Sequence, residues 1–312
     1  GLQLDTPRWA AWTVMSLALP TRGAVAAKGL WRAGGTLLGL AGGLIAVATF
    51  AQSAIAMGLF LATWFALNAY VGGSLPGLAA YGAALSGLTT GLVVILSASA
   101  PLSIFNIALA RAADIFLGLA CVYVASTIAE SMQGPPPTTA LESVPSPNPA
   151  QVTGNAVRAF VAVGLSWAIW MATAWPSGGI FVVFAGVVVI FFATMPDPDR
   201  RVSAYLWGVA LGQGLGLFVK YLLLDAPSSF GLLAEILSPF IFIGAVGMTD
   251  QRTAGPAIGY NLSFLLAVEP ANPMQYDLAG SLNEAAAIFA GIAFGLAAYR
   301  IVLPENVWRI AR

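Results

Sequence analysis

Eleven apolar segments follow one another along this chain and dominate what it can fold into. They cover residues 7–20, 29–50, 53–71, 75–98, 103–129, 155–174, 177–195, 202–224, 230–248, 255–268 and 279–302. A helix needs about 20 apolar residues to cross a bilayer, where irregular backbone cannot satisfy its polar groups. Only 8% of the residues are charged, against roughly 25% in soluble domains. The sequence therefore predicts an all-α, polytopic transmembrane helical bundle in a lipid bilayer.

The two halves of the chain share a pattern at a constant offset. Residues 110–120 return 173 positions later as residues 283–293, with six of the eleven positions identical. Glycines spaced by four residues keep the same offset: Gly35, Gly39 and Gly43 match Gly208, Gly212 and Gly216. Such rows favour close helix packing. We interpret the chain as two parallel-topology repeats of six helices each, with the first helix of repeat one missing and eleven spans present.

The domain organisation follows from this repeat and from the basic residues. We expect a first transmembrane repeat over residues 1–131, a linker over 132–154 and a second transmembrane repeat over 155–304. Residues 305–312 would begin a cytoplasmic C-terminal segment. Six prolines lie between Gln133 and Pro149, a density typical of an extended linker. Most basic residues near span ends share the side of this linker, so the positive-inside rule makes that side cytoplasmic.

Several classes of function are disfavoured by composition. The net charge is zero, which gives no reason to expect a nucleic-acid partner. Cys121 is the single cysteine and histidine is absent, so we expect no disulfide within the chain, no metal site and no cofactor. No nucleophile–base constellation can be assembled, so the chain is not expected to be an enzyme. Proton chemistry near neutral pH would depend on carboxylates.

Arg111 and Asp114 are the central candidates for function. They lie near the middle of the segment that begins at residue 103, where a charge facing lipid costs about 2.5–3.5 kcal/mol. Both side chains should therefore face the protein interior, and their i, i+3 spacing lets them pair. One interpretation is a structural ion pair that locks helices together. The other is that Arg111 binds an anionic substrate while Asp114 modulates that binding or carries a proton.

Glu284, at the position that matches Arg111, is the second candidate. It is either a carboxylate at the interface near a helix N-terminus or a partner of Arg111 across the pseudo-symmetry axis, taking part in proton coupling. Asn283 and Asp277 would complete this polar site, for substrate and proton respectively, or merely cap the helix.

Three aromatic residues deep in their segments are further candidates. Trp64, Tyr81 and Tyr260 could line a pocket for an aromatic ligand. Packing against lipid explains them equally well.

Motifs in both halves resemble one known family. They are Asp5–Val14 and Arg32–Gly39 in the first half, and Ala174–Gly178, Met195–Pro198 and Asn272–Asp277 in the second. Together, in this order and spacing, they resemble the fusaric acid resistance and aromatic acid exporter family over nearly the whole chain. The family's arginine, followed three residues later by an acid, corresponds to Arg111 and Asp114. The family usually carries a sizeable cytoplasmic domain between its halves, where this chain has only the proline-rich linker.

The resemblance implies a multi-pass exporter in the bacterial inner membrane. Its substrates would be small aromatic carboxylates or related toxic amphipathic compounds, exported by proton antiport and so linked to drug resistance. A periplasmic membrane-fusion adaptor protein would be its partner, and a homo-oligomer, with a dimer favoured, is compatible with the sequence. Two alternatives stay open, a passive organic-anion channel and a non-transporting membrane scaffold.

Overall fold

The computed structural model describes residues 8–17, 24–75, 77–98, 101–133, 148–224, 229–271 and 273–304. Within these ranges every regular element is a helix. The α-helices are α1 (Arg8–Leu17), α2 (Ala24–Phe50), α3 (Ala54–Ser74), α4 (Ala79–Ser97), α5 (Ile104–Gln133), α6 (Pro149–Thr173), α7 (Gly178–Phe191), α8 (Pro198–Phe218), α9 (Phe230–Gly247), α10 (Ala254–Val268) and α11 (Leu278–Ile301). A short 3₁₀ turn, η1 (Pro101–Ser103), precedes α5, and a π turn, η2 (Val219–Leu223), extends α8.

Eight of the described helices are long and apolar enough to cross a membrane, whereas the sequence predicts eleven spans. These eight are α2, α3, α4, α5, α6, α8 with its π turn, α9 and α11. The helices α7 and α10 are apolar but have 14 and 15 residues, and α1 has ten. Each of the eleven predicted segments contains a helix. The helix α7 ends at Phe191, four residues before the end of its predicted segment. The helix α10 has the bounds of its predicted segment to within one residue, and it ends where Glu269 adopts a left-handed conformation before Pro270.

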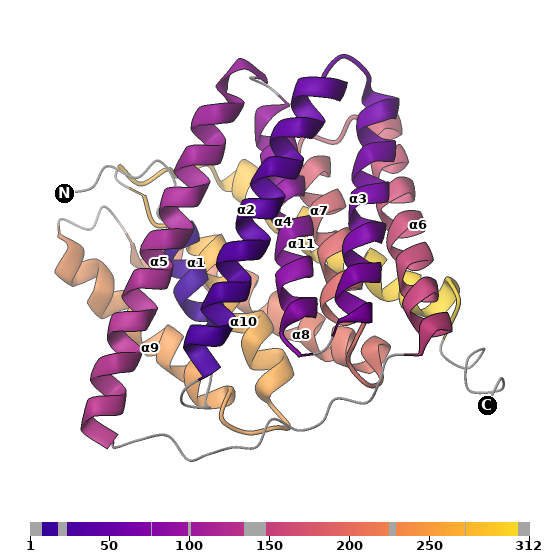
Figure 1. Ribbon diagram of the computed structural model, residues 1–312. Coiled ribbons are helices and arrows are strands. Elements are labelled where there is room, and N and C mark those ends of the chain that lie inside the picture. The colour runs from indigo at the N-terminus through magenta and orange to yellow at the C-terminus, as the bar shows by residue number, and fades with distance from the viewer. Residues whose placement is uncertain are drawn as a thin grey trace.

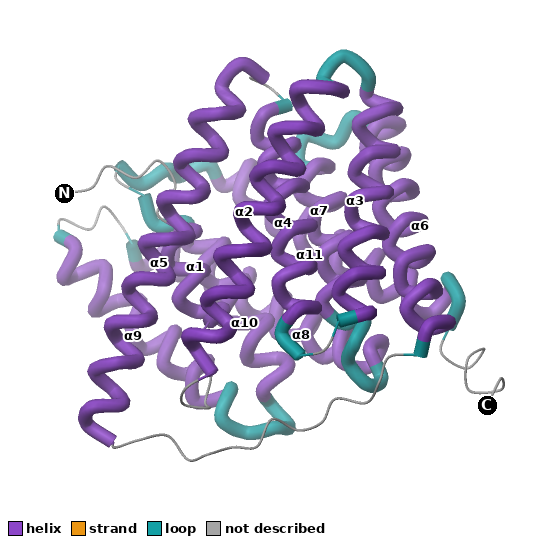
Figure 2. The backbone as a smooth tube through the Cα atoms, in the orientation of Figure 1, coloured by secondary structure: helices purple, strands orange, loops and turns teal. Residues whose placement is uncertain are grey.

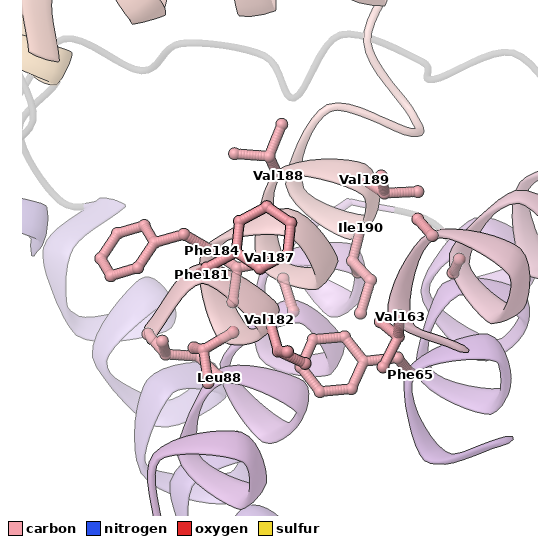
Figure 3. Packing of buried hydrophobic residues seen from close by; sticks show 14 of the residues in the cluster. Phe65, Leu88, Val163, Phe181, Val182, Phe184, Val187, Val188, Val189 and Ile190 are labelled. Carbon is pink, nitrogen blue, oxygen red and sulfur yellow. The ribbon is translucent and has the colours of Figure 1, made fainter. Parts of the chain in front are cut away.

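The helix α7 lies at the centre of the bundle and packs against α3, α4, α6 and α11. Figure 1 shows it behind the row formed by α5, α2, α3 and α6. Its side chains are almost all buried, and Figure 3 shows Phe65 of α3, Leu88 of α4 and Val163 of α6 turned toward it. Gly186 leaves room for the Phe65 ring, which a Cβ at that position would meet. A helix of purely apolar residues is thus enclosed by its neighbours.

The glycine rows make the two closest helix pairs of the structure. A Cβ at Gly35 or Gly39 would meet the backbone of α4 at Gly82 and Ser86. The hydroxyl of Thr90 on α4 donates to the carbonyl of Gly39 over 2.9 Å. Because small residues let backbones approach, α2 and α4 pack closely along this row.

The second row makes the same arrangement in the other half. A Cβ at Gly208 would meet the carbonyl of Pro256 on α10, and one at Gly212 would meet that of Tyr260. Ser263 on α10 donates to the carbonyl of Val209 over 3.2 Å. The pair formed by α8 and α10 therefore packs backbone against backbone, as α2 and α4 do.

The helices on either side of the predicted linker differ slightly from the sequence-based bounds. The helix α5 continues to Gln133, and α6 begins at Pro149 rather than at residue 155. Asn148 caps α6, because its side chain accepts from the amide of Ala150 over 3.0 Å, and proline suits the first helical turn. Residues 134–147 of the linker and residues 305–312 lie outside the described residues. Figure 2 shows α5 and α6 at opposite sides of the bundle.

Candidate functional site

A buried lysine lies at the end of α8. Lys220 is 1% exposed. Its ammonium group lies 3.2 Å from the carboxylate of Glu269 and donates to the hydroxyl of Ser281, also over 3.2 Å. The hydroxyl of Tyr221 lies 3.0 Å from that of Ser281. Three segments, the ends of α8 and α10 and the start of α11, thus bring a charged and hydroxylic cluster together inside an apolar bundle.

Local backbone geometry positions this cluster. Lys220 belongs to the π turn η2, a conformation that is rare and often occurs at functional sites. Glu269 follows α10 in a left-handed conformation, with φ 48° and ψ 60°. Non-glycine residues adopt this conformation only where their surroundings enforce it. Both charged groups are therefore held by irregular backbone at helix ends.

A small cavity adjoins Glu269 and Ser281, the two residues that contact the lysine. Its polar lining comes from Gln213 of α8, from Glu269, and from Ser281 and Glu284 of α11; Leu266, Ala267, Ala285 and Ile288 supply the apolar lining. The cavity measures about 10 Å³, close to the smallest volume that holds a water molecule. The amide nitrogen of Gln213 is buried without a hydrogen-bond partner in the described structure. The cavity therefore offers a donor to any small polar group that occupies it.

The predicted residues of α11 divide between this cavity and the helix end. Glu284 is half-buried and lines the cavity. Asn283 instead links α11 to the turn before α7: it accepts from the Trp175 indole over 2.6 Å and donates to the Ser177 hydroxyl over 2.7 Å. Asp277 caps α11 by accepting from the amide of Gly280 over 3.0 Å. Of these three, only Glu284 lies at the cavity.

Arg111 and Asp114 are both buried on α5, at 3% and 1% exposure. This burial agrees with the expectation that neither side chain faces lipid. Arg111 does not line the cavity that Glu284 lines, and the described parts of α5 and α11 share no extensive contact. The bridge between Arg111 and Glu284 stays a prediction.

The three aromatic candidates lie in different packing environments. Trp64 on α3 stacks on Phe60, with ring centroids 5.7 Å apart. Tyr260 on α10 donates to the carbonyl of Phe240 on α9 over 3.1 Å. Tyr81 on α4 accepts from Arg32 of α2 over 3.0 Å. None of the three lines the cavity beside Lys220, so their role in binding an aromatic ring also stays a prediction.

Lys220, Gln213 and Ser281 were not singled out by the sequence analysis. Lys220 lies close to the end of its predicted apolar segment. Such a position is typical of a residue at the membrane–water interface. A signal was nevertheless present: Lys220 is an isolated charge between Val219 and Tyr221, and three consecutive leucines follow. Ionisable residues inside membrane segments are functional candidates by default. The π turn that places Lys220 inward has no clear sequence signature.

Eight apolar helices that enclose buried arginine, lysine and aspartate define a multi-pass membrane protein. The chain belongs to the fusaric acid resistance protein family, whose model matches residues 1–135 and 128–312. This match confirms the resemblance seen in the sequence motifs.

Curated relatives match parts of the chain. An uncharacterized transporter of Gluconobacter oxydans is 27% identical over 156 residues, which are 50% of this chain and 21% of the relative. The p-hydroxybenzoic acid efflux pump subunit AaeB of Musicola paradisiaca is 30% identical over 40% of this chain and 21% of its own length. AaeB of Pantoea ananatis is 26% identical over 51% of this chain and 24% of its own length. The chain thus spans about a fifth to a quarter of these relatives. No solved structure gives a significant match.

Proposed function

We propose that this protein is an inner-membrane secondary transporter that exports aromatic carboxylic acids or related amphipathic toxic compounds in exchange for protons. Family membership and the similarity to p-hydroxybenzoic acid efflux pump subunits support the substrate class. A periplasmic adaptor of the membrane-fusion type would receive the exported acid. A homo-oligomer, with a dimer favoured, also belongs to the proposal.

The observation that carries the proposal is the buried Lys220, whose partners Glu269 and Ser281 line a polar cavity. A substrate carboxylate needs a cation and hydrogen-bond donors when it leaves water. Lys220, Ser281 and the free amide nitrogen of Gln213 supply this chemistry at one place. In this structure the carboxylate of Glu269 pairs with the ammonium group of Lys220. An incoming substrate carboxylate would therefore compete with Glu269 for the lysine.

The cavity is too small for an aromatic ring, so the structure corresponds to a closed state in this proposal. A cavity of about 10 Å³ holds one water at most. Opening would require α8 and α11 to separate near Ser281. The π turn gives α8 a place where its hydrogen bonds can rearrange. Alternating access through such interrupted helices is common in secondary transporters.

Matched helix contacts support the repeat that is part of this proposal. The pairs α2–α4 and α1–α5 of the first half correspond to α8–α10 and α7–α11 of the second. Contacts between the halves correspond as well, because α4 packs against α7 as α10 packs against α1. We place the transport pathway between these two halves, with Arg111 and Asp114 in one and the lysine cluster in the other.

Asp114 and Glu284 are the acids to which we assign proton coupling. Glu284 lines the cavity, where a water molecule could deliver a proton. A change in the charge of Glu284 would alter which anion the lysine cluster binds, because charges interact strongly away from bulk water. Protons arriving from outside would thereby be exchanged for the exported acid.

Glu284→Gln is expected to abolish the stimulation of export by external acid, while export down a substrate gradient continues. Glutamine keeps the size and hydrogen-bonding capacity of the side chain but takes up no proton. The measurement is efflux of labelled p-hydroxybenzoate from proteoliposomes with the membrane potential clamped. Glu235→Gln, on the exposed face of α9, is the matched control and should keep full stimulation.

The same assay separates the alternatives. Flux that ignores the pH gradient in the unaltered protein, together with single-channel currents in planar bilayers, would support a passive organic-anion channel and contradict antiport. A complete lack of flux, with no ligand-dependent thermal stabilisation across a panel of aromatic acids, would support a membrane scaffold.

A further inference from the structure

Another buried cation lies near the start of α2, whereas Lys220 lies at the end of α8. Arg32 of α2 is 2% exposed. Its guanidinium donates to the hydroxyl of Ser16 over 2.7 Å, to that of Tyr81 over 3.0 Å and to that of Thr13 over 2.9 Å. One turn earlier on the same helix, the half-buried Lys28 donates to the carbonyl of Ser16 over 2.7 Å. Three helices, α1, α2 and α4, therefore converge on two neighbouring positive charges.

The partners of these two cations are neutral. Arg32 contacts hydroxyl groups, and Lys28 contacts a carbonyl and, at 4.9 Å, the ring of Tyr81. Neither cation lies within ion-pair distance of a carboxylate in the described part of the chain. The carbonyl of Ser16 belongs to the last turn of α1, and a helix C-terminus contributes only about half a negative charge. Among the described residues, two positive charges thus have less than one negative charge to balance them.

This imbalance is unusual for a buried site. A charge removed from water without a counter-charge is costly, so buried cations are normally paired. The Nε–H group of Arg32 is also buried without a hydrogen-bond partner in the described structure. A planar guanidinium with an unused donor is well suited to a carboxylate, which it can bind with two parallel hydrogen bonds.

Aromatic rings surround the charges. The indole of Trp12 lies 5.4 Å from the guanidinium carbon of Arg32, and Tyr81 makes an edge contact with Phe191 of α7. A ligand that carried its carboxylate to Arg32 would meet these rings with its apolar part. Lys28 and Tyr81 are only partly buried, so part of the cluster lies at the surface of the described structure.

We propose that Lys28, Arg32 and Tyr81 form a binding site for the carboxylate of an aromatic acid at the cytoplasmic end of the bundle. The cytoplasmic assignment follows from the basic residues on that side, and the choice of ligand rests on the proposed export function. The site lies near the start of α2, whereas Lys220 lies at the end of α8. The acid would thus bind first on the inner side and later reach the lysine cluster.

Equilibrium binding of p-hydroxybenzoate to the full chain in lipid nanodiscs tests this site. Lys28→Gln and Arg32→Gln are each expected to weaken binding about tenfold, the effect of losing one charge-assisted hydrogen bond. The uncharged p-hydroxybenzamide should bind equally weakly to all forms. Arg201→Gln is the matched control, because Arg201 is an exposed basic residue at the start of α8, and it should bind the acid normally. Arg32→Lys keeps the charge and should recover part of the affinity if Arg32→Gln fails to fold.

Two outcomes would overturn the proposal. The first is unchanged affinity in folded Lys28→Gln and Arg32→Gln. The second is a loss that appears only in nanodiscs with anionic lipid, which would assign the cations to a lipid phosphate. Measuring both binding and transport distinguishes a failure of this binding site from a failure of the proposed export function. Binding that depends on Lys28 without any transport leaves the site intact and contradicts export, whereas export with binding independent of both cations contradicts the site.

Discussion

Lys220→Met is expected to lower the export of p-hydroxybenzoate at least tenfold. Methionine retains the length of the side chain but removes the ammonium group that contacts Glu269 and Ser281. A hydrogen bond to a charged group contributes about 1.5–3 kcal/mol, which corresponds to roughly a tenfold to hundredfold change in binding. The measurement is the initial rate of efflux from proteoliposomes, normalised to the amount of folded protein.

Two further variants distinguish substrate binding from a structural role. Arg300→Met removes an exposed positive charge near the end of α11 and should leave export unchanged. In the double variant Lys220→Met/Glu269→Gln neither charge remains. If Lys220 serves only to neutralise Glu269, the double variant should recover export; such recovery would contradict a role for Lys220 in binding the substrate.

Gly212→Val is expected to destabilise the fold. Its side chain would meet the backbone of α10 at Tyr260 and Phe264, and a backbone cannot move aside as a flexible side chain can. Overpacking of this kind costs about 1–3 kcal/mol or more, and here it forces apart the two helices that carry Lys220 and Glu269. The measurement is the thermal unfolding temperature of the purified protein in detergent.

A glycine two residues away provides the control. A Cβ at Gly214 would meet nothing within 4 Å, and this residue is exposed. Gly214→Val therefore makes the same change in helix propensity without the clash. Equal unfolding temperatures for the two variants would show that the contact between α8 and α10 does not limit stability.

The helical architecture could be predicted because apolar length and proline positions are local properties. The glycine rows also indicated close packing, since their spacing of four residues places them on one helix face. The predicted segment 255–268 gave the length of α10, but the sequence did not indicate that α7 would end at Phe191. Helix ends of this kind depend on turns whose conformation is set by contacts across the bundle.

The candidate site was harder to predict, and Arg111 and Glu284 illustrate why. Matching positions in two repeats are equivalent in their own halves, but they meet only when they lie beside the axis that relates the halves. An offset in sequence carries no information on that distance. Lys220 presents the opposite difficulty: its position in an apolar segment was visible, but the direction of its side chain depends on a π turn that local pattern does not reveal.

The π turn at the end of α8 has a consequence for how a small movement could be amplified. An α-helix advances about 100° per residue, and a π turn accommodates one additional residue within a turn. If the hydrogen bonds of residues 219–223 shifted by a single register, the Lys220 side chain would swing around the helix axis without any translation of α8 as a rigid rod. The ammonium could thereby exchange one set of neighbours for another at the cost of a few backbone hydrogen bonds.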